Sequence, residues 1–244
     1  MISFFKKIRK SAIVNSNFRR IALYALGEIF LVVIGILIAV SINNWNKERS
    51  DRQATKASLL GLLSDLKKDS ARLSFLHAEY HKNTARCDSI ISRLELSDSD
   101  PQRSTIIRYD FIRFFSLNPS TAAFEEMKNS GKLYTLSNIG LSSSITQYYT
   151  NLDRNESYIE NGHERIRFHM DQPTLNDYWL AVRKKNNDTH IKWIEDKESS
   201  THQAFEFLVY LAKGRFRSNK QKVEQIKQQA AKLVRLIELE IERI

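Results

Sequence analysis

The stretch IALYALGEIFLVVIGILIAVSI, residues 21–42, decides how the rest of the chain is interpreted. Glu28 is its one charged residue, and the others are apolar or small. A helix of this length extends about 33 Å, which is enough to cross the roughly 30 Å hydrocarbon core of a bilayer. The apolar run exceeds the 7–15 or so residues of a signal-peptide core, so we expect an uncleaved transmembrane helix.

The flanks of this segment differ in charge. Residues 1–20 hold six basic residues and no acidic one, whereas residues 43–56 hold four basic and two acidic residues. Because basic flanks are retained in the cytoplasm, we expect a cytoplasmic N-terminus, an inner-membrane span and a periplasmic C-terminal domain. Apolar and basic residues of an amphipathic arm, and aromatic residues near both ends of the span, are expected at the membrane interface: Phe4, Phe5, Lys6, Lys7, Arg9, Lys10, Tyr24 and Trp45.

The net charge of +10 is unevenly distributed. Residues 1–20 contribute +6, Glu28 contributes −1, and residues 43–244 contribute the remaining +5. More than half of the excess therefore belongs to an arm that flanks the membrane, and we expect the lipid bilayer rather than nucleic acid as its partner. Cys87 is the single cysteine, so no intrachain disulfide can form.

One face of the span carries its acid and its small residues. Helical spacing places Glu28, Leu31, Gly35, Ala39 and Ile42 on the same side. A charged acid at mid-membrane costs about 2.5–3.5 kcal/mol, and small residues four apart allow close helix approach. We interpret this face as a contact surface for a second copy or another membrane protein. The alternatives are a shallow acid hydrogen-bonded to Tyr24, and a proton or ion path.

The remaining sequence predicts an all-α protein in which the transmembrane helix continues into a long stalk helix and an elongated bundle. We divide the chain into a basic arm (1–20), the span (21–42), a stalk (43–96) and a bundle (97–244) that packs back on the stalk. Apolar residues recur at steps of three and four along the stalk, interrupted by Asp69 and Asn83. They are Leu59, Leu62, Leu66, Leu73, Leu76, Tyr80, Cys87, Ile90 and Leu94.

Breaks and caps divide the bundle region. Residues 106–117 read as a short buried helix, with a strand as the alternative, and the next helix is capped by Ser120 or Thr121 and ends at Gly131. A long helix is expected from residue 137 or 138, with a polar part, residues 150–165, that crosses solvent. A helix from Thr201 is expected to stop at Gly214. A second apolar seam follows over residues 218–244, broken by Glu240.

No residue set predicts catalysis, a metal site or a cofactor. The sequence contains no P-loop, GxGxxG, GxSxG or CxxC motif. His77 and His81 share a helical face, but Glu79 stands where it cannot complete an HExxH site, so a solvated face is the expected reading. Aromatic residues supply one candidate ligand surface: Phe111, Phe115, Tyr148, Tyr149 and Trp179.

FFKKIRK (4–10) followed by LYALGEIFLVVIGILIAVSINNWN (23–46) resembles an uncharacterised family in Bacteroidota. Members carry a similar YxxGEIxLVxxGIxIAxxxNxWN run. TAAFEEMKNSGKLYTLSNIGLSSSITQYY (121–149) is similar to the second segment of that family, where a Ser-Gly turn separates two helices. The resemblance covers most of residues 1–150 and implies a single-pass membrane protein with an exported helical domain. It implies no activity.

We expect a non-enzymatic binding or scaffolding component of an envelope complex, acting as a homo-oligomer or with another membrane protein. The alternative is a periplasmic ligand-sensing subunit that signals through a partner membrane protein, because the short arm leaves little chain for output in the cytoplasm.

Overall fold

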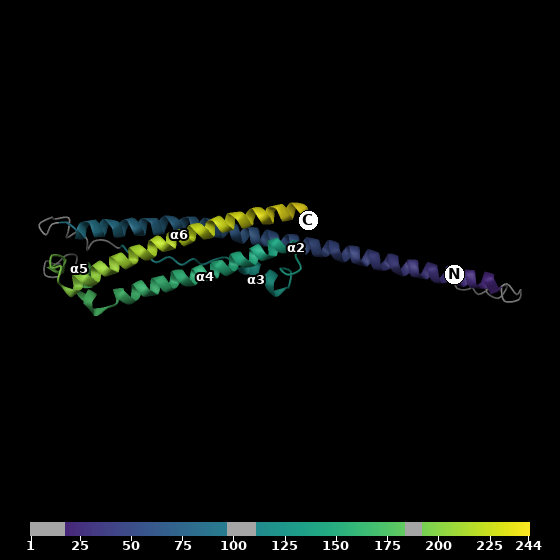
Figure 1. Cartoon of the computed structure of the whole chain (residues 1–244), viewed down its shortest axis with the longest axis horizontal. Coiled ribbons are helices and arrows are strands. Elements are labelled where there is room, and N and C mark those ends of the chain that lie inside the picture. The colour runs from purple at the N-terminus through teal and green to yellow at the C-terminus, as the bar shows by residue number, and fades with distance from the viewer. Residues whose placement is uncertain (1–17, 97–110, 184–191) are drawn as a thin grey trace. The chain divides into compact units, whose positions relative to one another are not determined.

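The computed structural model describes residues 18–96, 111–183 and 192–244, with side chains described from Ala22 onward. These residues contain α-helices, two short 3-10 helices and irregular segments but no β-strand, which confirms the all-α class. The chain divides into two compact units, residues 1–56 and 57–244. The long helix α2 (Phe18–Leu94) contributes residues to both (Figure 1). The four-part division made from the sequence stays a prediction.

The first unit contains the apolar part of α2. Its side chains are exposed from Leu23 to Ser50, including aliphatic residues that a water-soluble helix would bury. This helix is long and apolar enough to cross a membrane, and no residue of its most apolar part is buried within the protein. The predicted span therefore has the length, composition and exposure that a lipid-facing helix requires.

The second unit is built on three helices: residues 57–94 of α2, α4 (Ile139–Met170) and α6 (Ser200–Arg243), which lie side by side in Figure 1. Lys213 of α6 pairs with Asp88 of α2 at 2.6 Å, and Glu224 lies 3.9 Å from His77. The numbers rise along one helix as they fall along the other, so α2 and α6 are antiparallel. All nine apolar positions of the predicted stalk seam are buried here.

Residues 111–121 form an extended segment that lies along α2. The expected helix over residues 106–117 is wrong from residue 111 onward, and residues 106–110 lie outside the described part. Polar side chains of α2 hold the backbone of this segment in place of helical hydrogen bonds. Arg72 donates to the carbonyl of Ser116 (2.6 Å), Tyr80 to Phe115 (2.7 Å) and Asn83 to Arg113 (2.8 Å), and Asp69 accepts from the N–H of Ser120 (2.8 Å). Asp69 and Asn83, which interrupt the apolar seam, are thus among the residues that hold this segment.

The short helix α3 (Ala122–Asn129) begins and ends as the sequence predicts, but its cap is supplied from elsewhere. Thr121 occupies the N-cap position without a capping side-chain bond. Asp65 of α2 accepts the Ala123 N–H at 3.1 Å, so a distant carboxylate satisfies this helix end. Gly131 has φ +78°, the left-handed conformation that glycine favours, and its turn ends the helix.

Helix α4 keeps one face buried along its whole length. Asn138 caps it by accepting from the Leu141 N–H. The expectation that residues 150–165 cross open solvent is wrong, because Leu152, Ile159 and His163 of this stretch are buried. Their spacing of seven and four residues keeps them on one side of the helix, which the abundance of polar residues on the other side obscured.

Helix α6 runs without a break from Ser200 to Arg243, so the expected stop at Gly214 is wrong. Ala212 and Phe216 are fully buried on either side of this glycine, and continuous packing of the apolar face outweighs the roughly 1 kcal/mol cost of one helical glycine. Glu240, which breaks the second seam, is buried and accepts a 2.9 Å hydrogen bond from Asn138.

Replacing Gly214 by alanine is expected to raise the free energy of unfolding by about 0.5–1 kcal/mol, because the helix is continuous there and a Cβ would meet open space. The matched control is Gly131→Ala, which forces a side chain into a positive-φ turn and is expected to destabilise by about 1 kcal/mol. Urea unfolding of both variants in detergent micelles measures the change in the free energy of unfolding, which should be positive for Gly214→Ala and negative for Gly131→Ala. A helix that ends at Gly214 would lose stability with alanine.

The connection between α4 and α6 folds into an aromatic cluster. It contains η2 (Pro173–Leu175), α5 (Asn176–Arg183) and η4 (Lys192–Ile194). The ring of Phe205 lies at centroid distances of 4.8 Å from Tyr178, 5.2 Å from Trp193 and 5.8 Å from Phe111. This cluster closes the end of the bundle where α4 meets α6.

Candidate functional site

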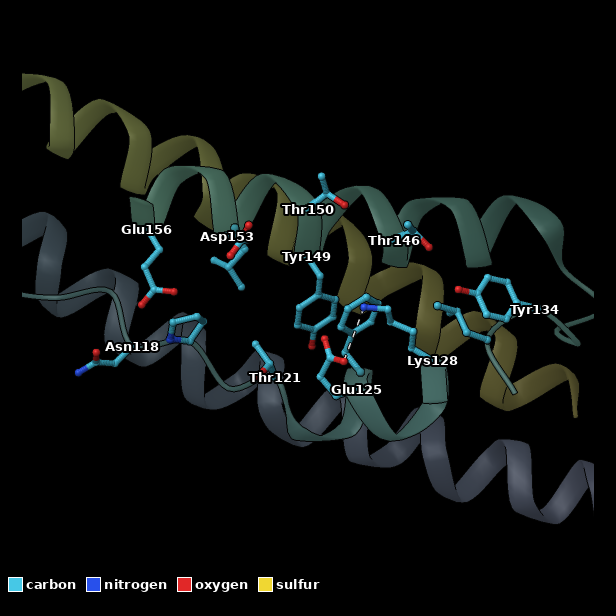
Figure 2. A pocket seen from close by; sticks show the side chains of 14 residues that line it. Asn118, Thr121, Glu125, Lys128, Tyr134, Thr146, Tyr149, Thr150, Asp153 and Glu156 are labelled. Carbon is cyan, nitrogen blue, oxygen red and sulfur yellow. Dashed lines mark ion pairs between the residues drawn. The ribbon is translucent and has the colours of Figure 1, made fainter. Parts of the chain in front are cut away.

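A groove of about 700 Å3 lies between α4 and the stretch that runs from the extended segment through α3 to the following turn. Figure 2 shows Asn118, Asp153 and Glu156 at one end of the groove and Tyr134 at the other. All its lining residues belong to the second unit: Asn118, Pro119, Thr121, Phe124, Glu125, Lys128, Leu133, Tyr134, Thr146, Tyr149, Thr150, Leu152, Asp153 and Glu156. A groove of this size falls in the usual range for ligand sites.

The floor of the groove is aromatic. Phe124 of α3 and Tyr149 of α4 stack with ring centroids 4.2 Å apart and an interplanar angle of 10°. Both residues are buried, whereas Tyr134 at the far end is 71 % exposed. Asn118 adopts φ +47°, an uncommon conformation for a residue with a side chain, which turns the chain before Pro119 and shapes the near end.

The walls carry an excess of negative charge. Three carboxylates (Glu125, Asp153 and Glu156) and one ammonium group (Lys128) line the groove, which gives a net charge of −2. Glu125 is paired with Lys128 at 3.7 Å. Asp153 and Glu156 make no ion pair with any residue in the described part of the chain. A groove of this sign contrasts with the net charge of +10 of the whole protein.

Beneath the floor, Asp69 and two tyrosines bury polar atoms that lack partners among the described residues. These atoms are Asp69 Oδ2 and the hydroxyls of Tyr148 and Tyr149. Burial raises the pKa of both tyrosines, and the charge of Asp69 raises them further. Burial also raises the pKa of Asp69 above its ordinary value, while the hydrogen bond from Ser120 opposes that shift. The groove therefore lies above a small cluster of incompletely satisfied polar groups.

Asp69→Asn is expected to raise the free energy of unfolding at pH 7 by on the order of 1 kcal/mol. An acid whose folded-state pKa is raised destabilises the fold when ionised, and this penalty disappears as the pH falls through that pKa. The advantage of asparagine should therefore shrink between pH 7 and about pH 4. Urea unfolding of the parent protein and the variant across this pH range measures the difference in their free energies of unfolding.

Asp69→Ala is the contrasting variant, because alanine leaves the Ser120 N–H without its acceptor and should destabilise by about 1–3 kcal/mol. Equal destabilisation by asparagine and alanine at pH 7 would contradict the assignment of a costly buried carboxylate.

The five aromatic residues expected to form one ligand surface lie in different places. The ring centroids of Tyr148 and Tyr149 are 5.1 Å apart, and Tyr149 lines the groove. Phe111 belongs to the aromatic cluster around Phe205, Phe115 packs on Phe75 at 5.5 Å, and Trp179 donates to the Met170 carbonyl. They therefore do not form one surface, and only Tyr149 lines the groove.

The residues predicted for the transmembrane face lie on the exposed part of α2. Leu31 is 73 % exposed and Ile42 is 55 % exposed, and a Cβ on Gly35 would meet nothing within 4 Å. Glu28 and Ala39 are exposed as well, as are the interface residues Tyr24 and Trp45. Phe4, Phe5, Lys6, Lys7, Arg9 and Lys10 lie outside the described residues. The roles of both sets stay predictions.

No group of three or more metal-ligating side chains occurs within residues 18–96, 111–183 and 192–244. His77 lies near Glu224 of α6, and Glu79 pairs with Lys82 at 2.6 Å. On α4, Arg167 pairs with both Glu160 and Glu164.

Sequence reasoning missed the groove because its lining residues come from an extended segment, a turn and a helix that no periodic pattern connects. Asn118 and Asp153 belong to no sequence motif that predicts a binding site, and Glu156 is one of several acidic residues at helical spacing. The adjacent Asn118-Pro119 turn was the only local sign of a backbone feature.

The fold and the apolar helix define a helical protein whose described residues include one candidate membrane span. Residues 28–165 match the family described as "Family of unknown function (DUF6090)", and the chain belongs to this family. The match begins within the apolar part of α2, ends in α4 and includes every residue that lines the groove. No curated protein and no solved structure matches the chain.

Proposed function

We propose that this protein is a single-pass, non-enzymatic membrane protein whose N-terminal arm is cytoplasmic and whose C-terminal helical unit is exported and binds a partner. The observation that carries the proposal is the exposed apolar part of α2, which has no protein neighbours in the described structure and is long enough to span a bilayer. The basic arm before it supports the orientation, because positively charged flanks stay in the cytoplasm.

A contact between spans supports the binding role. The face of Glu28, Leu31, Gly35, Ala39 and Ile42 combines one acid with small residues, and in a bilayer such faces form helix–helix interfaces. The acid would meet a polar group on a second copy or on another membrane protein. The bundle then presents its groove and exposed surface on the far side of the membrane from the arm.

The native cysteine allows a clean test of topology. Cys87 is buried, and burial raises the pKa of its thiol to about 12, so it should not react with maleimide at neutral pH. Lys197 is exposed in the second unit, and Ser16 precedes the span. In cells with a permeabilised outer membrane, we expect a membrane-impermeant maleimide to label Lys197→Cys, and to label Ser16→Cys only after the inner membrane is lysed. The reverse pattern, or release of the protein by carbonate washing, would overturn the proposal.

The partner-binding part is tested separately by crosslinking in mild detergent. We expect self-association or a defined hetero-complex that Glu28→Gln and Gly35→Leu together disrupt, while Gly27→Leu, on another face of the same helix, leaves it intact. Recovery of only monomer from several detergents would contradict a binding role for the span.

A further inference from the structure

We propose that the groove between α4 and residues 118–134 binds an extended segment of a partner protein that carries basic and aromatic side chains. This inference rests on the proposed function, since it names the chemistry of a partner for the exported unit.

The carboxylates at one end of the groove would bind a positively charged group. Asp153 and Glu156 are three residues apart on α4 and therefore share a helical face, and both line the groove (Figure 2). Neither is neutralised by a basic residue within the described ranges, although nearby Glu125 has Lys128 as its partner. An incoming arginine or lysine would supply the missing charge, and a planar guanidinium matches carboxylate geometry best.

The floor of the groove favours apolar contact with a bound segment. The Phe124–Tyr149 stack and the exposed ring of Tyr134 offer aromatic surface along the groove. The hydroxyl of Tyr149, on a residue that is only 4 % exposed, has no hydrogen-bond partner among the described residues. This hydroxyl is itself buried beside Asp69, so the floor offers a bound segment aromatic surface and not this polar group.

The arrangement along the groove favours a peptide over a small ion. The acids stand at the Asn118 end and Tyr134 at the other, with the aromatic floor between them (Figure 2). In an extended segment, alternate side chains point to the same side, so a basic residue and an aromatic residue a few positions apart can reach the two ends together. Bare metal ions are poorly served, because the described residues contain no group of three or more suitable ligands.

The experiment measures binding of a defined peptide to the full-length protein in detergent micelles by fluorescence polarisation at constant salt. The probe is a fluorescein-labelled, eight-residue peptide with two arginines near one end and a phenylalanine near the other. The reference peptide has citrulline in place of arginine, which keeps the shape and removes the charge. Spermine is titrated as a competitor that carries charge without a peptide backbone.

Asp153→Asn combined with Glu156→Gln is expected to weaken binding of the arginine peptide about tenfold. The matched control is Glu206→Gln with Glu238→Gln, which makes the same change in net charge at two exposed positions of α6 outside the groove and should leave the affinity unchanged. Both double variants alter solvent-accessible side chains, so tryptophan fluorescence and the thermal midpoint should stay as in the parent protein.

Tyr134→Ala tests the aromatic surface at the far end of the groove. It removes an exposed ring that lines the groove, so the thermal midpoint should stay nearly unchanged, but peptide affinity should drop by about threefold or more. Retained affinity would exclude a contact between this ring and the bound segment, and with it the proposed placement of the aromatic side chain of the peptide.

Three results would overturn the inference: equal binding of the citrulline peptide, equal losses in the two double variants, or spermine binding as tight as the peptide. The first result excludes recognition of the positive charge of the segment. The second attributes binding to the overall charge of the protein and not to the groove carboxylates. The third indicates that the ligand is a small polycation. The topology and crosslinking results do not depend on the groove. A failed peptide with an intact crosslinked complex therefore rejects the groove and leaves the proposed function standing.

Discussion

Replacing Phe205 by alanine is expected to lower the free energy of unfolding of the second unit by about 3–5 kcal/mol. The side chain is fully buried at the start of α6, where its ring touches those of Tyr178, Trp193 and Phe111. Truncation leaves a cavity among large rings that cannot close over it without disturbing the connection between α4 and α6. For a unit of this size the thermal midpoint should fall by roughly 6–20 °C.

The matched control is Phe207→Ala, two residues along the same helix. Phe207 is 52 % exposed and contacts one imidazole, that of His169 at 4.9 Å. Its removal should cost about 1 kcal/mol or less. Tryptophan fluorescence during denaturant unfolding reports on both variants, because Trp193 belongs to the affected cluster. Comparable midpoints for the two variants would contradict the central place of Phe205.

The second large loss of stability is expected on substitution of Tyr80, with separate contributions from its hydroxyl and its ring. Tyr80 is fully buried, stacks on Phe216 at 6.2 Å and donates a 2.7 Å hydrogen bond to the Phe115 carbonyl of the extended segment. Tyr80→Phe keeps the ring and removes the donor, which should cost about 0.5–1.5 kcal/mol. Tyr80→Ala removes both, and the total should reach about 3–5 kcal/mol.

Hydrogen exchange distinguishes the two parts. With Tyr80→Phe, the increase in exchange should be concentrated in residues 111–121, because that segment loses one of the side chains that hold it. Tyr210→Ala is the control, since this tyrosine is 47 % exposed on α6 and its loss should change stability by about 0.5 kcal/mol or less. A uniform increase in exchange across the bundle with Tyr80→Phe would show that the hydroxyl does not hold the segment.

The helical class and the buried positions of α2 followed from the sequence because a three-four spacing of apolar residues directly reports which face of a helix is buried. Leu59 through Leu94 illustrate this, as do Val223 through Ile237 on α6, with the apolar residues of both seams buried at the predicted positions. Local chemistry also predicted a helix start at residue 137 or 138, where Asn138 is the cap, and a stop at Gly131, because both act on neighbouring backbone atoms.

The extended segment could not be predicted, because its conformation depends on side chains 30 to 51 residues away. Residues 111–117 have an apolar and aromatic composition that suits a helix, but Asn83, Tyr80 and Arg72 take up their carbonyl groups instead. The same applies to α3, whose cap is Asp65 rather than a neighbouring residue. The groove depends on this segment, so it was unpredictable for the same reason.

Gly214 shows the opposite error, in which a local signal was overridden. A glycine ends a helix only where no tertiary packing continues beyond it, and here Ala212 and Phe216 are both fully buried in the same face. A sequence pattern compares a residue only with its neighbours along the chain. In the bundle, the conformation at Gly214 is determined by the packing of the whole 44-residue helix.

The antiparallel pairing of α2 and α6 has a consequence for biosynthesis. Asp88 and its partner Lys213 are 125 residues apart in the chain. At about 5–20 residues per second, translation needs roughly 6–25 s to reach the second after the first. During that interval the leucine face of α2 has been made and its partner has not. The nascent chain therefore has to be kept from aggregating until its last 44-residue helix is complete, and truncations that remove α6 should be degraded rather than accumulate as a shorter folded form.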